Sequence, residues 1–362
     1  MNHISILQSD SPFGNFCWPS VARLRDGRIV AVCSGHRLAH VCPFGKVVCS
    51  ISEDDGKTWS APITLIDTPL DDRDAGITPY GDGFIITTFT NTREFQLRYN
   101  TQHPLSEEHN KLVRERVAQI TDEEENAYFG AFFYVFGADL KERHHGRIPL
   151  SAPHGMSVLA DGRLMYVGRY TQSSETAPDE NFNRIGVTFS EDGKHFGEIA
   201  WIDLELEKHP ARTLFCEPHG IGLSNGKILV QYRVEIPGVP FAVYQSVSLD
   251  GGKSFTVPAP ISVPEKTMSG SPPHMLELKD GRVVLTYGYR LRPFGQRARI
   301  SCDSGETWGR EIVLRDDGLN WDLGYPATVE LNNGELLTLY YQIPTGHENR
   351  AILATVWSPN EE

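Results

Sequence analysis

One sequence pattern recurs six times along this chain: an apolar strand, an Asp-Gly or Asn-Gly turn, and a second apolar strand. The repeats begin at Pro19, Ala75, Pro153, Pro218, Pro273 and Pro326. The turn glycines, Gly27, Gly83, Gly162, Gly226, Gly281 and Gly334, lie about 53 to about 79 residues apart, at or above the usual length of a propeller blade. Six hairpins that fill the chain predict radial repetition. We therefore expect an all-β, six-bladed β-propeller that forms a single domain over residues 1–362.

Two segments fall outside the six hairpins. The last repeat is one strand short, because only RAILATVW follows GELLTLYYQ, and HISILQ near Met1 is unassigned. The N-terminal strand is therefore expected to close the last blade, which removes exposed sheet edges. Around residues 104–125, the segment from Ser106 to Ile120 has a helical pattern with Ser106 as N-cap. This insertion between the second and third strands of blade two is expected to form a wall of the channel mouth, or alternatively to pack outside.

The composition excludes several classes of partner. The net charge of −13 disfavours nucleic acids and anionic membranes. No apolar run reaches the length of a membrane span, and the N-terminus lacks the features of a secretion signal. The six cysteines form no CxxC pair, which is typical of buried thiols in a reducing compartment. We therefore expect a cytoplasmic protein without a cofactor, or a secreted one if a signal has been removed; the sequence leaves its oligomeric state open.

A second pattern, S-x-D-x-G-x-T-W, follows the hairpins. It occurs at Ser52–Trp59 and Ser301–Trp308, with related copies at Ser248–Phe255 and Ser190–Phe196. The Asp side chain can accept backbone N–H groups across the turn, the Gly can adopt positive φ, and the aromatic ring can pack into its blade. These turns are expected to be structural and not catalytic.

These turns are the Asp-boxes of the sialidase superfamily, which the chain resembles over essentially its whole length. The resemblance implies that CEPHGIGLSNGKILVQYR supplies a functional Glu217 and Arg233, and that DLGYPATVEL supplies Tyr325 as a nucleophile activated by the Glu. Three features depart from the family. Cys17 stands where the first carboxylate-binding arginine is expected, and the blade-one loop GHRLAHVCPFG lacks the Asp that serves as the acid. For the third arginine, blade five offers Arg290, Arg292 and Arg297 without a clean match. The chain therefore looks like a divergent branch that keeps the scaffold and changes the sugar.

Equivalent positions of the repeats predict which side chains meet at the channel mouth. The residues just before the repeat starts are Trp18, Asp74, Ala152, Glu217, Pro272 and Tyr325, and three histidines follow the repeat Pro, at His154, His219 and His274. The ends of the second strands add Arg169 and Arg233, with Arg37 and Arg290 a little further along, and Arg73, Trp321 and Asp322 lie near the mouth. A purely structural core would not need such a costly polar cluster. Substrate binding is the first interpretation of the histidines, and a shared metal ion is the alternative.

The leading hypothesis is a sialidase-like exo-glycoside hydrolase that acts on a terminal, acidic sugar. Tyr325, Glu217 and Asp74 would be catalytic, although a histidine could replace Asp74 as the acid; Arg37, Arg169, Arg233 and Arg290 would bind the acidic sugar, with further contacts from Arg73, the three histidines, Trp18, Trp321 and Asp322. One alternative is a polysaccharide lyase with His and Tyr as acid and base. The other is a propeller that binds carbohydrate without turnover.

Overall fold

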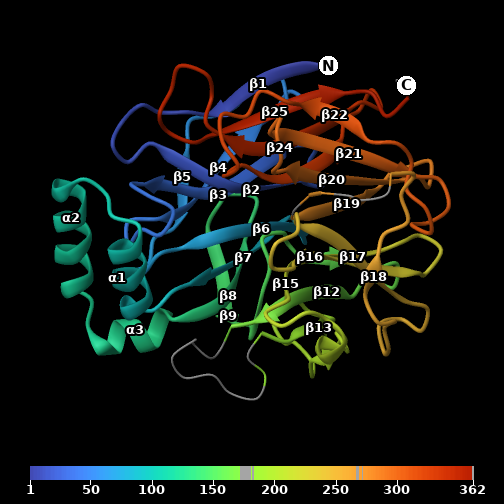
Figure 1. The fold of residues 1–362 in the computed structure, drawn as a ribbon, viewed down its shortest axis with the longest axis horizontal. Helices are drawn as coiled ribbons and strands as arrows, with labels where there is room; N and C mark the ends of the chain where they lie inside the picture. The colour runs from blue at the N-terminus through green and yellow to red at the C-terminus, as the bar shows by residue number, and fades with distance from the viewer. Residues whose placement is uncertain (172–180, 182, 266–268, 271, 361–362) are drawn as a thin grey trace.

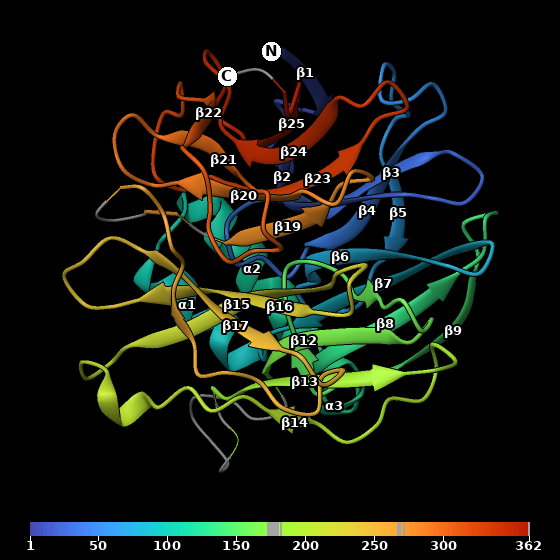
Figure 2. The same ribbon diagram turned by 90° about the vertical axis from the view of Figure 1, so that its right-hand side faces the viewer.

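Each sequence repeat forms one antiparallel sheet, and six sheets build a six-bladed β-propeller, as the sequence predicted (Figures 1 and 2). The computed structural model describes residues 1–171, 181, 183–265, 269–270 and 272–360. In each blade the first strand of the hairpin lies innermost, and consecutive innermost strands contact one another around the ring. The starts of these strands therefore meet at one end of a central channel.

The first three blades take up the N-terminal half of the chain. Blade one contains β2 (Asn15–Arg23), β3 (Ile29–Arg37), β4 (Lys46–Ser52) and β5 (Ile63–Ile66). Blade two contains β6 (Arg73–Tyr80), β7 (Gly83–Thr90), β8 (Gly130–Phe136) and β9 (Glu142–Arg147). Blade three contains β10 (Leu150–Ser151), β11 (Ser157–Val158), β12 (Leu164–Tyr170), β13 (Ile185–Ser190) and β14 (Ala200–Trp201). In blade three, β10 and β11 both pair with β12, so they are two pieces of one interrupted inner strand.

The last three blades repeat the arrangement. Blade four contains β15 (Leu214–Gly222), β16 (Ile228–Glu235), β17 (Ala242–Ser248) and β18 (Ala259–Pro260), preceded by the 3-10 helix η1 (Leu206–Lys208). Blade five contains β19 (Pro273–Glu277), β20 (Val283–Tyr289), β21 (Gly295–Ser301) and β22 (Ile312–Arg315). Blade six contains β23 (Gly324–Glu330), β24 (Leu336–Gln342), β25 (Ala351–Trp357) and β1 (Asn2–Leu7).

The N-terminal strand closes the ring. β1 pairs antiparallel with β25, from Asn2 opposite Val356 to Leu7 opposite Ile352. The two termini consequently lie close together at blade six (Figure 1). Because β1 covers the outer edge of β25, the last blade has the same four strands as its neighbours.

Alternation along the strands builds the core between the blades. On β3, Ile29 and Ala31 point toward blade six and Val30 and Val32 point toward blade two. Successive strand residues face opposite sides of a sheet, so a continuous apolar strand can pack against both neighbouring blades at once. A buried hydrophobic cluster lies at each of the six junctions between neighbouring blades.

The Asp-box turns act as structural connections. The Asp54 carboxylate accepts hydrogen bonds from the backbone N–H groups of Lys57 and Thr58 at 3.1 and 2.8 Å. It also accepts from the Thr58 and Ser52 hydroxyls, at 2.6 and 2.9 Å. Gly56 has φ +86°, which favours glycine. The same contacts recur around Asp250 and Asp303, and Trp308 is buried between blades four and five.

The insertion in blade two is larger than the single helix expected at residues 104–125. It contains α1 (Arg93–Gln102), α2 (Glu107–Ala118) and α3 (Asp122–Tyr128), between β7 and β8. The predicted helix is α2, with Ser106 as its N-cap. The apolar pattern missed α1 because its buried residues include Gln96 and Asn100, and missed α3 because none of its residues is buried. No helix in the described ranges is long and apolar enough to cross a membrane.

Candidate functional site

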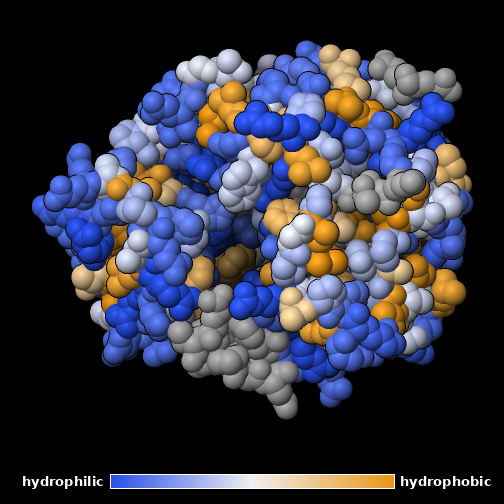
Figure 3. Space-filling view, in the orientation of Figure 1, coloured by the Kyte–Doolittle hydropathy of each residue, from blue (hydrophilic) through white to orange (hydrophobic). Residues whose placement is uncertain are grey.

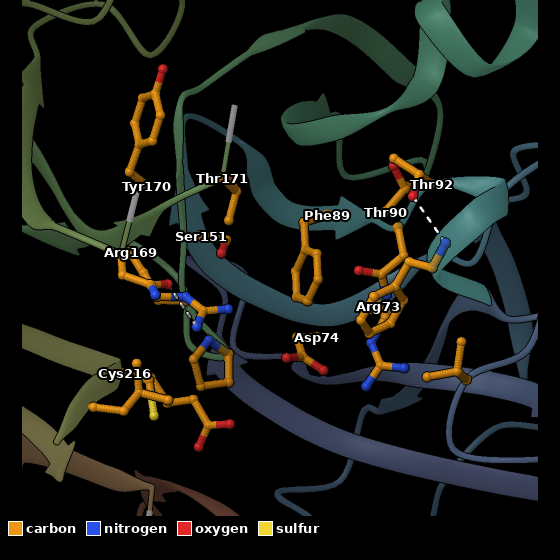
Figure 4. A pocket seen from close by; sticks show the side chains of 18 of the residues that line it. Arg73, Asp74, Phe89, Thr90, Thr92, Ser151, Arg169, Tyr170, Thr171 and Cys216 are labelled. Atoms are coloured by element: carbon orange, nitrogen blue, oxygen red, sulfur yellow. Dashed lines mark hydrogen bonds between the residues drawn. The ribbon is translucent and has the colours of Figure 1, made fainter. Parts of the chain in front are cut away.

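A cavity of about 330 Å³ opens at the end of the channel where the innermost strands begin. Figure 3 shows the surface hollowed beside the helical insertion, and Figure 4 shows the side chains that line the cavity. Strand starts contribute Asp74, Glu217 and Tyr325, and ends of second strands contribute Arg169 and Glu235. α1 supplies one wall, whereas the predicted helix α2 supplies no lining residue. The insertion therefore does border the mouth, through its first helix.

Four blades share an unusual backbone conformation at the mouth. Trp18, Asp74, Glu217 and Tyr325 have φ values of +52°, +48°, +48° and +52°, at the same position of their repeats. In each case the strand pairing shifts register at this point, as in a β-bulge. Bulky residues rarely adopt positive φ, and such strain concentrates at functional sites. Three of these four residues line the cavity, and the bulge is what turns their side chains toward it.

Tyr325 and Glu217 are in direct contact. The Tyr325 hydroxyl donates a hydrogen bond of 2.5 Å to the Glu217 carboxylate, whose other oxygen accepts from Arg233 at 2.8 Å. Burial would raise the pKa of Glu217, but the charges of Arg233 and Arg290 and the Tyr325 hydrogen bond outweigh it, so this pKa is lowered. Burial, followed by the Glu217 charge, raises the pKa of Tyr325 well above its usual range. The pair therefore consists of a carboxylate and a neutral phenol at neutral pH.

Asp74 is the second carboxyl group of the cavity with a shifted pKa. Burial raises its pKa to about 6, the Glu217 charge adds to the rise, and Arg73 opposes it. Its side chain is 7% exposed and one oxygen has no hydrogen-bond partner among the described residues. Two carboxyl groups whose environments separate their pKa values in this way are suited to opposite proton-transfer roles.

Arg37 does not line the cavity, contrary to the role expected from its sequence position. It is fully buried and forms a 2.7 Å ion pair with Asp71, which is also fully buried. Its guanidinium and that of Arg73 cover the Trp18 ring, at 4.8 and 4.2 Å from the ring centroid. Trp18 is therefore 1% exposed and unavailable for stacking on a sugar. Arg73 does line the cavity, and it also contacts Asp71 at 3.3 Å.

Trp321 and Asp322 lie outside the cavity lining. Trp321 is 58% exposed and faces the guanidinium of Arg290, which lies 5.8 Å from its ring centroid. Asp322 accepts hydrogen bonds from Arg350 and from Tyr341, at 2.5 and 2.6 Å. Its carboxylate therefore links Arg350 and Tyr341 at the rim of the channel.

Several lining residues escaped the sequence analysis, among them His40, Tyr99, Glu235, Ser151 and Thr171. His40 comes from the blade-one loop, 3.8 Å from Asp322, and its ring stacks on Tyr99 of α1. Neither residue occupies a repeated position, so the repeat register carried no signal for them. Glu235 lies two residues after Arg233 on β16, and strand alternation could have placed both side chains on one face.

The three predicted histidines meet in the channel and do not line the mouth cavity. The ring centroids of His154, His219 and His274 lie 4.5 to 5.1 Å apart. His219 and His274 line a second cavity, of about 310 Å³, in the remainder of the channel. Burial lowers the pKa of all three imidazoles, to about 3 for His219, so they are neutral.

The alternative of a metal ion on these histidines finds no support in the geometry. His219 and His274 stack with ring planes 14° apart, so one ion cannot lie in both ring planes. The His219 Nδ1 atom already accepts a hydrogen bond of 2.9 Å from the backbone N–H of Met275. Within the described part of the chain, no group of three or more His, Cys, Asp or Glu side chains is arranged to hold a metal ion.

Comparisons with solved structures show the same fold in several proteins. A Dyadobacter fermentans protein of unknown function has 23% sequence identity and a TM-score of 0.76, with 99% of this chain and 98% of that chain covered. A Penicillium chrysogenum α-L-arabinanase complexed with arabinobiose has 13% identity and a TM-score of 0.64, with the same coverage. A Trypanosoma rangeli sialidase in complex with the inhibitor DANA has 14% identity and a TM-score of 0.56, covering 97% of this chain and 57% of that chain.

Sequence comparisons complete the assignment. Curated protein sequences contain no significant match. The family model described as BNR repeat-like domain matches residues 151–338, which is just over half of the chain and includes three of the four Asp-box turns or their close relatives. The BNR-repeat, six-bladed propeller that the sequence indicated is thus confirmed, and the likeness to the sialidase shows a shared fold. The chain belongs to the BNR repeat-like domain family.

Proposed function

We propose that this protein is an exo-acting glycoside hydrolase that removes a terminal, acidic sugar. The observation that carries the proposal is the 2.5 Å hydrogen bond from Tyr325 to Glu217 at the mouth of the channel. A cavity of about 330 Å³ is at the small end of ligand pockets, which suits one terminal sugar better than the interior of a long chain. Two of the structural neighbours are named as a sialidase and an arabinanase, which supports a carbohydrate ligand.

The proposed chemistry uses the charge states of the site. The Tyr325 oxygen attacks the anomeric carbon while the ionised Glu217 takes the phenolic proton. Protonated Asp74 gives its proton to the leaving oxygen as the glycosidic bond breaks, which leaves a glycosyl–tyrosine intermediate. Water then attacks the anomeric carbon with Asp74 as base, and Glu217 returns its proton to the tyrosine oxygen. The sugar is released with retention of configuration.

A neutral nucleophile suits an acidic sugar. A carboxylate nucleophile would be repelled by a negative group near the anomeric carbon, whereas a phenol develops charge only as its proton leaves for Glu217. Arg233, 2.8 Å from Glu217, favours the ionised base before the reaction. For the lyase alternative, His40 is the histidine that lines the mouth cavity, because His154, His219 and His274 are not among the lining residues.

A panel of chromogenic glycosides tests the proposal. It includes sialic acid and other ulosonic acids, uronic acids and neutral sugars, offered to the wild type, Glu217→Gln and Tyr325→Phe. Tyr340→Phe is the matched control, since Tyr340 is equally buried but bonds Thr355 away from the cavity. We expect release of one sugar class, lost in both site variants and kept in the control. The proposal would be overturned if sugar release survived both site changes, or if polyuronates gave an unsaturated product that absorbs ultraviolet light. Saccharide binding without any sugar release would indicate a propeller that binds carbohydrate without turnover.

A further inference from the structure

Three arginines near the mouth already contact carboxylates. Arg37 is buried against Asp71, and Arg73 contacts the same carboxylate. Arg233 lies between two carboxylates, 2.8 Å from Glu217 and 2.7 Å from Glu235. A guanidinium held between two negative charges has little attraction left for a third. Arg233 therefore serves Glu217 and is poorly placed to bind the acidic group of a sugar.

Arg290 is not among the residues that line the cavity. Its guanidinium packs among aromatic rings, 5.7 Å from the Tyr325 centroid and 5.8 Å from those of Phe241 and Trp321. These are cation–π distances, so the aromatic faces already provide part of its stabilisation. Its charge contributes to the lowered pKa of Glu217.

Arg169 differs from these four arginines. It lines the cavity, and among the described residues no carboxylate contacts it. In that part of the chain its side chain makes a long 3.5 Å hydrogen bond to Asn183. Figure 4 shows Arg169 and Arg73 on opposite sides of Asp74. Of the two arginines that line the cavity, Arg169 is thus the one that contacts no carboxylate among the described residues.

Two hydroxyl groups lie beside this guanidinium. Ser151 is the direct cross-strand partner of Arg169 in the β10–β12 pair, and it also lines the cavity. Thr171 follows Arg169 by two residues, lines the cavity, and has a buried hydroxyl without a hydrogen-bond partner in the described ranges (Figure 4). A guanidinium with neighbouring hydroxyl donors is the donor set that carboxylate and sulfate groups prefer.

We propose that Arg169, with Ser151 and Thr171, binds the negatively charged group of the substrate. The inference rests on the proposed function, and it places the acidic group against blade three. The resemblance to sialidases would instead place it against Arg233 on blade four and an arginine of the blade-five segment RLRPFGQRAR. The ligand class is a saccharide that bears a carboxylate or a sulfate ester, two oxyanions that this donor set can hold.

Calorimetric titration of the whole protein tests the subsite without requiring turnover. The ligands are methyl β-glucuronide, N-acetylglucosamine 6-sulfate and neutral methyl β-glucoside, at low salt. We expect at least one acidic ligand to bind more tightly than the neutral one in the wild type. Arg169→Gln should weaken that acidic ligand about tenfold or more and leave the neutral ligand unchanged, because a charge-assisted pair is lost. Which acidic ligand is preferred identifies the group as carboxylate or sulfate.

Arg184→Gln is the control, since Arg184 lies on the same blade and packs over Trp201 at 4.3 Å, outside the cavity lining. It should retain the wild-type preference. Three results would overturn the inference: no acidic preference in the wild type, a preference that survives Arg169→Gln but is lost in Arg290→Gln, or equal weakening of acidic and neutral ligands by Arg169→Gln. If an acidic preference depends on Arg169 but no glycoside is cleaved, the subsite stands and the proposed hydrolysis fails. If a glycoside is cleaved but the preference for acidic ligands does not depend on Arg169, the proposed hydrolysis stands and the Arg169 subsite fails.

Discussion

Replacing Asp74 with Asn is expected to stabilise the protein at alkaline pH. Burial raises the pKa of Asp74 from its ordinary value of 3.8 to about 6, so the folded protein holds this proton more tightly than the unfolded chain does. The stability that the neutral form provides is fully present below pH 3.8 and is lost as the pH rises through about 6. Asn resembles the protonated acid in shape and in lack of charge, and it does not ionise. The variant should therefore keep the low-pH stability at every pH.

The size of the effect follows from the shift of about two pKa units. At 1.36 kcal/mol per unit, the wild type at pH 8 carries a deficit of about 3 kcal/mol relative to the variant. At pH 5 the deficit is roughly half as large, about 1.5 kcal/mol, because the folded carboxyl is mostly protonated while the unfolded one is ionised. Asp74 is 7% exposed, so solvent screening reduces these values little.

Urea unfolding of the wild type and Asp74→Asn at pH 5 and pH 8, followed by tryptophan fluorescence, measures the effect. A change in packing or hydrogen bonding that does not depend on pH alters the unfolding free energy of the variant equally at both pH values. The informative quantity is therefore how much the stability difference between variant and wild type changes from pH 5 to pH 8. Asp54→Asn is a control of opposite sign, because hydrogen bonds from Thr58 and Ser52 lower the pKa of Asp54 and favour its ionised form in the fold. A difference between wild type and Asp74→Asn that is the same at both pH values would refute the assignment of a neutral, buried Asp74.

Further measurements test other parts of the structure. Asp71→Asn should destabilise the fold by about 3–5 kcal/mol in urea unfolding, because it leaves the buried Arg37 guanidinium without its carboxylate partner. The control Asp26→Asn breaks an exposed ion pair with Arg28 and should cost at most about 1 kcal/mol. Equal losses of stability in the two variants would contradict the buried ion pair. Burial lowers the pKa of His219 to about 3, so this residue removes about 1.4 kcal/mol of folding stability for each unit by which the pH falls between 6.5 and 3. In His219→Gln, the plot of unfolding free energy against pH should be flatter by that slope. Parallel plots for wild type and variant would show that the imidazole is not buried as a neutral group. With a known substrate, kcat/KM should fall about tenfold per pH unit above roughly pH 6, because Asp74 loses its proton. The loss of kcat/KM in Asp74→Asn should be smallest for glycosides with good leaving groups. A kcat/KM that stays constant from pH 6 to pH 8 would show that Asp74 is not the acid.

Local sequence patterns determined the propeller and part of its site. The Asp-Gly and Asn-Gly turns, the apolar strands and the Asp-boxes each act within one blade, through backbone conformation and alternation, so they can be read without tertiary information. The register of the repeats also placed Asp74, Glu217 and Tyr325 at equivalent strand starts, and the structure shows all three at the mouth cavity. The helices α1 and α3 were missed because their sequences lack the apolar periodicity on which helix prediction depends.

Tertiary structure alone decided which charges remain available and which residues face the cavity. The partner of Arg37 is Asp71, which precedes the next blade, and the second partner of Arg233 is Glu235. Among the described residues, Arg169 is the cavity-lining arginine without a carboxylate contact. The histidines share a repeat position, yet they follow the bulge and point into the channel below the mouth cavity. Such outcomes depend on distances of a few ångströms between side chains of different strands and blades. Coulombic attraction and desolvation vary steeply over those distances, and a one-dimensional pattern does not contain them.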